Sequence, residues 1–188
     1  MLISKIDARY RQHSADRIAQ GDIARDFSFI VIDKSEAERK IIFPYIIVMS
    51  QDCDLEQCSN FVNDSQVEKE KKSNQHLHSV LFLPSFPSGE FREGEHLSDF
   101  GIKTDRINSD LWRKIKINEN PRYHFLKSDE NFQVPEMVVD FKAYYTLPLE
   151  YFQEQYEYCY LASLSELFRE DLSLRFANYL TRIGLPNI

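Results

Sequence analysis

The sequence predicts a mainly β protein that carries α-helices at both ends. Short stretches rich in β-branched and aromatic residues, separated by turn-forming residues, have the composition and length of strands. These stretches cover residues 27–32, 41–49, 79–83, 123–126 and 137–141, and residues 144–147 continue the last one after a kink. Pro44 lies inside the most apolar stretch, and it indicates an edge strand or a β-bulge because proline cannot donate a ladder hydrogen bond.

Helical spacing of apolar residues is clearest near the C-terminus. The residues with this spacing are Leu164, Phe168, Leu172, Phe176, Leu180 and Ile183. Ser163 as the N-cap, with Glu166 as its capping-box partner, predicts a helix over 163–183 that packs on the sheet. Weaker spacing predicts an amphipathic helix over 4–20, and Ser109 is expected to cap a short helix over 110–117.

Length and composition favour one globular domain. The chain has 188 residues, 43% of them hydrophobic, and a formal net charge of −7, which is typical of a folded protein. We expect a single domain over 21–188, preceded by a helical extension over 1–20 and carrying an inserted segment at about 87–127. The polar residues 51–75 predict a long loop, and residues 33–40 predict a charged hairpin connection.

Several classes of protein are excluded by the same sequence. Its apolar runs are too short to span a bilayer, and its first residues lack the apolar segment of a signal peptide. We therefore expect a cytoplasmic protein without membrane contact. The three cysteines do not indicate a disulfide framework. The glycine-rich loops of common nucleotide-binding folds are missing from the sequence, so no cofactor is expected.

Charge is unevenly distributed along this acidic chain. Residues 102–127 carry a net charge of +4, whereas residues 1–101 carry −5 and residues 128–188 carry −6. The stackable side chains within this basic island are Trp112, Tyr123, His124 and Phe125. Cations that contact phosphates and rings that stack on bases are what a single-stranded nucleic acid site needs. The competing interpretation is an ordinary solvated helix and loop whose aromatic side chains point inward.

The segment SQDCDLEQC, residues 50–58, follows the most apolar strand and has several interpretations. A zinc site would use a C-x4-C pair and an H-x-H pair, although on a strand the two histidine rings would point to opposite faces. The residues of this candidate set are Cys53, Cys58, His76 and His78. A hard cation could instead bind the carboxylates of Asp52, Asp54 and Glu56.

Two further interpretations of this segment involve Cys53. A nucleophilic Cys53 would need a histidine base, and the flanking carboxylates of Asp52 and Asp54 disfavour the thiolate. The simplest interpretation is a structural turn, in which Asp52 and Asp54 cap backbone N–H groups and Cys53 packs inward.

His124 is the histidine with the clearest chemical context. It lies within the basic island, at the start of a predicted strand and close to Arg122. Histidine can move a proton on and off the 2′-oxygen of RNA, and arginine can stabilise charge on the phosphate. The pair therefore fits RNA cleavage without a metal. The competing interpretation is a partly buried histidine with a satisfied hydrogen bond.

The order of the segments resembles a known family. The motif GDI at 21–23 precedes the first predicted strand, and PYIIVMS at 44–50 forms the next one. The motifs SVLFLP at 79–84, MVVDF at 137–141 and LSEL at 164–167 follow in turn. This order is similar to that of the MazF/PemK family of toxin–antitoxin ribonucleases. The resemblance implies a strongly bent, SH3-like β-barrel with a C-terminal helix, a homodimer and an antitoxin partner.

The sequence also departs from the pattern of that family. Phe43 stands where the family has an arginine, and Ser85 matches the family's hydroxyl residue only loosely. RNA cleavage by this chain would require Arg25, Arg39 or Arg122 to replace that arginine. The stretches SQDCDLE, VVDF and RFANYLTRIGLP also resemble uncharacterised bacterial or phage-borne proteins with an SQxCDL motif, which implies a mobile-element or defence context.

Two functional hypotheses result. The first is a toxin-like protein that binds single-stranded RNA, or a metal-independent endoribonuclease, of a toxin–antitoxin or phage-defence system. The second is a catalytically inactive barrel that serves as a protein-interaction module. In the first hypothesis the catalytic candidates are Arg122, His124 and Ser50. The candidates for substrate binding are Gln51, Asp52, Asp54, Arg113, Lys114 and Lys116.

Overall fold

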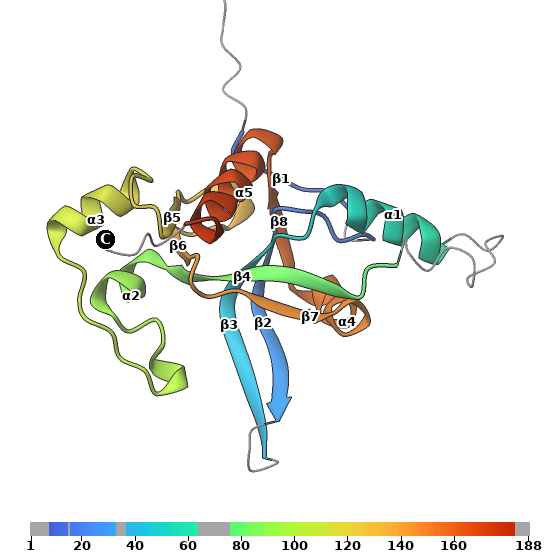
Figure 1. Ribbon diagram of the computed structural model, residues 1–188, viewed down its shortest axis with the longest axis horizontal. Coiled ribbons are helices and arrows are strands. Elements are labelled where there is room, and N and C mark those ends of the chain that lie inside the picture. The colour runs from blue at the N-terminus through green and yellow to red at the C-terminus, as the bar shows by residue number, and fades with distance from the viewer. Residues whose placement is uncertain (1–7, 15, 33–36, 64–75, 183–188) are drawn as a thin grey trace, which may run out of the picture.

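A curled antiparallel sheet forms the centre of the molecule (Figure 1). The computed structural model describes residues 8–14, 16–32, 37–63 and 76–182. Its strands are β1 (Tyr10–Arg11), β2 (Asp22–Ile32), β3 (Glu38–Val48), β4 (Ser79–Pro87), β5 (Tyr123–Leu126), β6 (Met137–Asp140), β7 (Tyr145–Pro148) and β8 (Tyr160–Leu164). Their order is β1-β8-β2-β3-β4-β6-β5, and β7 pairs with the first half of β4. The prediction of a mainly β, barrel-like fold with added helices is confirmed.

Helices surround this half-barrel. The α-helices of the described residues are α1 (Asp52–Asn63), α2 (Ser88–Glu93), α3 (Ser109–Lys116), α4 (Leu149–Cys159) and α5 (Glu166–Leu180). Two short 3-10 helices, η3 (Ser98–Phe100) and η4 (Glu130–Phe132), complete the described helical segments. None of the described helices is long and apolar enough to cross a membrane.

Both faces of the central part of the sheet are buried. Neighbouring residues of β3 point to opposite sides, so Ile46 belongs to one apolar cluster and Ile47 to the other. Helix α4 covers the first cluster with Phe152, whereas α5 covers the second with Leu172 and Phe176. Each fully buried apolar side chain stabilises the fold by about 1.5–3 kcal/mol, so the two helices hold the curled sheet from both sides.

Pro44 lies inside strand β3. The β2–β3 register passes from Arg25↔Tyr45 to Phe27↔Phe43, and Asp26 between them adopts a φ of 52°. Pro44 also precedes Tyr45, the residue at which β3 begins to pair with β4. The missing N–H of the proline therefore interrupts no ladder on that side. The prediction of an edge strand or a β-bulge is wrong, because β3 pairs with both β2 and β4 and its register with β2 continues without a shift past Pro44.

Two predictions for the first third of the chain are wrong. Residues 8–14 and 16–20 form no helix, because Tyr10 is buried and pairs with Leu164 of β8. The expected loop over 51–75 begins as helix α1, whose first turn carries Asp52 and Asp54. Carboxylates in the first turn stabilise a helix through its dipole. Residues 64–75 lie outside the described residues.

The helices of the second half follow the prediction with corrected ends. The C-terminal helix is confirmed but begins at Glu166, because Ser163 belongs to β8, and its N-cap Ser165 makes no capping side-chain bond. Helix α3 is capped by Asn108, whose side-chain oxygen accepts the N–H of Leu111 at 2.9 Å, and not by Ser109. Ile183 lies outside the described residues. Helix α4 was not predicted.

Candidate nucleic-acid interface

The basic island forms helix α3 and strand β5. Ile115 is fully buried in the core, and it fixes which side of α3 faces inward. Arg113 points away from Ile115, whereas Lys114 and Lys116 flank it on its two sides, and all three are exposed. The helix therefore presents three of the predicted substrate-binding cations to solvent, on a surface that runs around its exposed sides. Such a surface can contact the phosphates of a nucleic acid.

Most of the island's aromatic rings serve packing. Phe125 is buried in the core, and the half-buried Trp112 meets it edge to face at a ring distance of 6.1 Å. Arg92 covers Trp112 at 5.7 Å from the ring centre. The interpretation in which aromatic side chains point inward therefore holds for Trp112 and Phe125. Tyr123 differs, because its half-buried ring lines a hollow beside α3.

Arg122 is held in a fixed orientation by Asp140. Its Nε donates to Asp140 Oδ1 at 2.8 Å and its NH2 donates to Oδ2 at 2.5 Å, which is a bidentate pair between the residue before β5 and the last residue of β6. These hydrogen bonds raise the pKa of the guanidinium above its usual value. The Arg122 guanidinium also lies 4.9 Å from the centre of the Tyr123 ring. A planar cation held this firmly is well suited to recognise a phosphate.

A hollow of about 390 Å³ opens beside Arg122. Its walls include Arg122, Tyr123, Asp140 and His96, together with residues of the segment 104–111. His96 packs between Phe86 and Phe91, at ring distances of 4.9 and 4.3 Å. Its Nδ1 is buried and has no hydrogen-bond partner.

His96 is a candidate that the sequence analysis missed. Burial, assisted by the positive charge of Arg122, lowers the pKa of its imidazole, whereas Asp140 opposes that shift. A neutral imidazole at pH 7 can accept a proton. No local motif marks His96, because the fold of α2 and the segment after it brings this residue to Arg122. The hollow therefore joins one predicted residue with one that only the structure reveals.

His124 lies in the core, and only 3% of its surface is exposed. Its ring packs near Phe141, and its Nδ1 is buried without a hydrogen-bond partner. Burial lowers the pKa of His124 to about 3, and the positive charge of Arg175 contributes to the shift. The ring is therefore neutral at pH 7 and shielded from solvent. This geometry favours a packing role for His124.

The polar candidates of the SQDCDLEQC segment lie where β3 passes into α1. These candidates are Ser50, Gln51, Asp52 and Asp54. Ser50 Oγ accepts the N–H of Leu81 at 2.8 Å, so its hydroxyl joins the end of β3 to β4. Asp52 Oδ1 accepts the N–H of Gln20 at 3.2 Å. Gln51 and Asp54 are exposed. The structural-turn interpretation therefore holds for Asp52, which accepts a backbone N–H, but not for Cys53, which is exposed.

Helix α5 separates this polar group from the basic island (Figure 1). Near its start, Arg169 lies 3.4 Å from Asp52 Oδ2. Further along, Arg175 donates to the backbone carbonyls of Asn118 at 2.5 Å and Tyr123 at 2.9 Å. The structure therefore places the residues 50–54 across helix α5 from the basic-island candidates.

The zinc candidates do not converge. Cys53 is exposed and does not pack inward as predicted, whereas Cys58 is buried with its sulfur 4.0 Å from His76 Nδ1. The His76 and His78 rings are 5.3 Å apart, contrary to the expected opposite faces, because both residues precede β4. Within the described part of the chain, no three His, Cys, Asp or Glu side chains gather as metal ligands.

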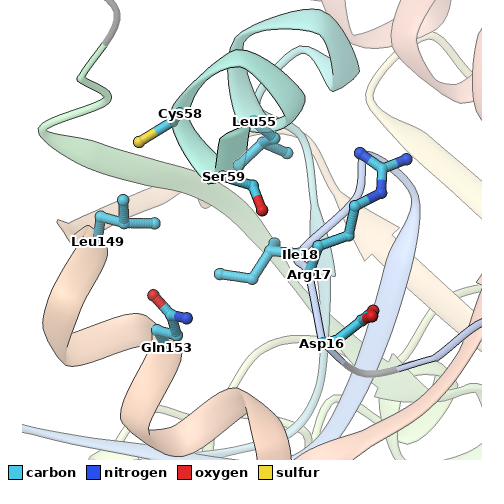
Figure 2. A pocket seen from close by; sticks show the side chains of 8 residues that line it. All are labelled: Asp16, Arg17, Ile18, Leu55, Cys58, Ser59, Leu149 and Gln153. Carbon is cyan, nitrogen blue, oxygen red and sulfur yellow. The ribbon is translucent and has the colours of Figure 1, made fainter. Parts of the chain in front are cut away.

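Cys58 lines a small cavity between α1 and α4. Figure 2 shows Leu55 and Ser59 of α1 facing Leu149 and Gln153 of α4 across it. Its volume is about 60 Å³, which suits a few water-sized groups and is too small for a nucleotide. The hollow beside Arg122 is therefore the better candidate for a ligand site.

Comparison with known protein families finds no match to this chain, and comparison with curated proteins finds none either. The candidate site therefore stands on its own geometry.

Proposed function

We propose that this protein binds single-stranded RNA through the basic island and cleaves it without a metal, as a toxin-like endoribonuclease of a toxin–antitoxin or phage-defence system. One observation carries the proposal. A fixed arginine, Arg122, and the half-buried imidazole of His96 line one hollow, whose wall also includes Leu111 of α3. Cations outside the hollow attract the phosphates, and the hollow supplies groups for proton transfer and charge stabilisation.

The fold supports the same proposal. We infer an SH3-like barrel related to the MazF/PemK family. The curled half-barrel, with α5 packed on it, supports this inference, because the resemblance implies a bent β-barrel with a C-terminal helix. Gly21 of the GDI motif adopts a φ of 86°, and it leads the chain into β2. A backbone position with a φ in this range favours glycine, and the GDI motif has a glycine at this position.

The proposed cleavage is an internal transesterification. His96 accepts the proton of the 2′-hydroxyl, and the 2′-oxygen forms a bond to the adjacent phosphorus. The bond from phosphorus to the 5′-oxygen breaks, and a solvent proton neutralises that oxygen. Arg122 stabilises the charge on the pentavalent phosphorus group. The products are a 2′,3′-cyclic phosphate and a 5′-hydroxyl end.

The experiment compares matched histidine variants. Wild type, His96→Gln and His124→Gln are incubated with mixed-sequence RNA in EDTA, and fragments and their end groups are scored. We expect cyclic-phosphate fragments from wild type and from His124→Gln, but not from His96→Gln. Cleavage by His96→Gln at the wild-type rate would overturn the role of that residue. Intact RNA with every protein would overturn the nuclease.

RNA binding is tested separately from cleavage. The triple variant Lys114→Ala, Lys116→Ala and Arg122→Ala should lose salt-dependent binding, because each lost phosphate contact lowers the slope against salt by about 0.7. Arg39→Ala combined with Lys40→Ala is the control, since both residues are exposed on the distant β2–β3 hairpin. Equal loss in the control would show a nonspecific charge effect.

A specific observation also favours the second candidate, a protein-interaction module. The β2–β3 hairpin extends beyond the rest of the sheet (Figure 1). It exposes Ile30, Ile32 and Ile42 on one face, because Ser28 pairs with Ile42 and Ile30 with Lys40. Exposed apolar patches of this kind mark protein contacts. The expected partner is an antitoxin or a second copy, and light scattering of Ile30→Thr against wild type tests the homodimer.

A further inference from the structure

A second basic and aromatic surface lies next to the hollow, at the end of α5. Its walls are Lys142, Tyr144, Tyr179, Leu180 and Arg182, around an open depression of about 440 Å³. None of the five is acidic, although the chain as a whole carries a net charge of −7. A comparable depression on α4 is instead lined by three glutamates. We call the first surface the tyrosine platform.

The aromatic rings of the platform pack against buried phenylalanine side chains. Tyr144 meets Phe176 edge to face at 5.9 Å, and Tyr179 lies 5.9 Å from Phe141. Phe141 and Phe176 are both buried. Tyr144 is nevertheless 51% exposed, so packing holds the ring while leaving much of it open to solvent. A ring held in this way loses little conformational entropy when a base stacks on it.

Asp140 connects the platform to the hollow. Its Oδ1 accepts both the Arg122 Nε at 2.8 Å and the backbone N–H of Lys142 at 3.0 Å. The N–H of Phe141 also donates to the Arg122 carbonyl at 3.0 Å. Asp140 lines the hollow, and Lys142 lines the platform. The two depressions are therefore joined through the single short turn of the chain at 140–142.

The remaining cation of the platform completes the pattern. Arg182 lies 5.8 Å from the centre of the Tyr179 ring, and its side chain is exposed, as is that of Lys142. Two exposed cations and an exposed ring within one depression provide contacts to phosphates and to a base. No hydrogen-bond pattern specific for one base is present among these five side chains, so stacking would tolerate any base.

We propose that the tyrosine platform is a second subsite for single-stranded RNA, in which a base stacks on Tyr144 while Lys142 and Arg182 contact the flanking phosphates. This inference rests on the proposed RNA-binding function and extends the path of the strand beyond the hollow. The platform supplies affinity and not chemistry, because it contains no group placed for proton transfer. Strands too short to span both subsites lose this contribution.

The test measures binding of labelled single-stranded RNA by fluorescence anisotropy with oligonucleotides of about 5 and about 15 nucleotides. Tyr144→Leu should weaken binding of the longer strand roughly 5- to 100-fold, because it removes one base stack. Tyr144→Phe keeps the flat ring and should bind like wild type. The combination of Lys142→Ala and Arg182→Ala should lower the salt slope by about 1.4, at about 0.7 for each contact.

The matched control is Tyr158→Leu. Tyr158 is 87% exposed on α4, beside the glutamates and away from the platform, so its replacement should leave binding unchanged. Wild-type binding that persists in Tyr144→Leu, but is lost in the basic-island triple variant, would overturn the platform alone. Wild type that binds no RNA would overturn the proposed function and the platform with it. Circular dichroism checks that each variant is folded.

Discussion

His13 and Asp22 form a pair whose geometry favours the doubly protonated histidine. His13 Nε2 lies 2.9 Å from Asp22 Oδ1, and Nδ1 lies 2.6 Å from the backbone carbonyl of Ser14. A carbonyl and a carboxylate can only accept, so both ring nitrogens must donate. The positive imidazolium is therefore the form that this geometry favours. It holds the segment that follows β1 against the buried start of β2.

This pair predicts that stability depends on pH. The hydrogen bond to Asp22 raises the pKa of His13, while burial and Arg17 oppose the shift. The stabilisation is present below the unfolded pKa of about 6.5 and is lost as pH rises through the higher folded value. The difference in unfolding free energy between wild type and His13→Gln should shrink as the pH rises above about 6.5. Urea denaturation at a series of pH values measures this difference. A difference that does not change with pH would contradict the prediction.

Asp22 itself should be among the most sensitive positions. Its carboxylate is fully buried and accepts the N–H of Ala19 at 2.6 Å and the hydroxyls of Tyr156 at 2.6 Å and Ser163 at 2.5 Å, in addition to His13. Removal of one partner from a buried charged network costs about 3–5 kcal/mol. We expect Asp22→Ala to lower the free energy of unfolding by that amount.

The control for Asp22 is Asp26→Asn on the same strand. Asp26 is exposed and adopts a positive φ that asparagine tolerates, so the change should be small. Guanidinium denaturation followed by circular dichroism compares the two variants. An Asp22→Ala variant as stable as Asp26→Asn would show that the network contributes no net stability.

Local composition reveals some elements of this fold and hides others. Strands β2, β3 and β4 were predictable because each contains a run of β-branched and aromatic residues. Strand β8 contains Ala162 and Ser163, and its extended form depends on pairing with β2 and β1. Helix α4 did carry a signal, because its buried residues Leu149, Phe152 and Tyr156 have helical spacing after a proline.

The site was predictable only in part, for a similar reason. Charge clustering along the sequence located Arg122 and the cations of α3. Alternation along β5 could not show that His124 is buried, because His124, Phe125 and Leu126 are all buried between helices on both faces. His96 approaches Arg122 only through tertiary folding, so no sequence window contains both residues. Burial and long-range proximity are the two properties that a single sequence does not display.

Gly94 shapes the wall of the hollow. It adopts a φ of 80°, and an added Cβ would lie 2.2 Å from the carbonyl oxygen of Thr104, whose N–H donates to Gly94. Gly94→Ala should therefore combine backbone strain with a clash and cost more than about 2 kcal/mol. Gly101 also has a positive φ but open space around it, so Gly101→Ala should cost only the strain, about 1–2 kcal/mol.

Chemical denaturation measures the loss of unfolding free energy in Gly94→Ala and in Gly101→Ala. RNA affinity shows whether the hollow is still formed in each variant. We expect Gly94→Ala to lose binding because the segment 95–107 can no longer close against α2. Gly101→Ala should bind normally. Equal stability of the two variants would contradict the prediction. It would mean that the segment 95–107 moves away from the added Cβ at little cost in free energy.

Arg122→Lys separates the shape of the cation from its charge. Lysine keeps the charge but cannot form the bidentate pair with Asp140, so the ammonium is free to move and hydrate. We expect RNA affinity to fall about tenfold with little change in salt slope, because the number of phosphate contacts is preserved while their geometry is lost. Arg113→Lys is the matched control, since Arg113 is exposed on α3 and its replacement should leave affinity nearly unchanged. Equal affinity of Arg122→Lys and wild type at all salt concentrations would show that only net charge matters, and the fixed guanidinium would then have no part in binding.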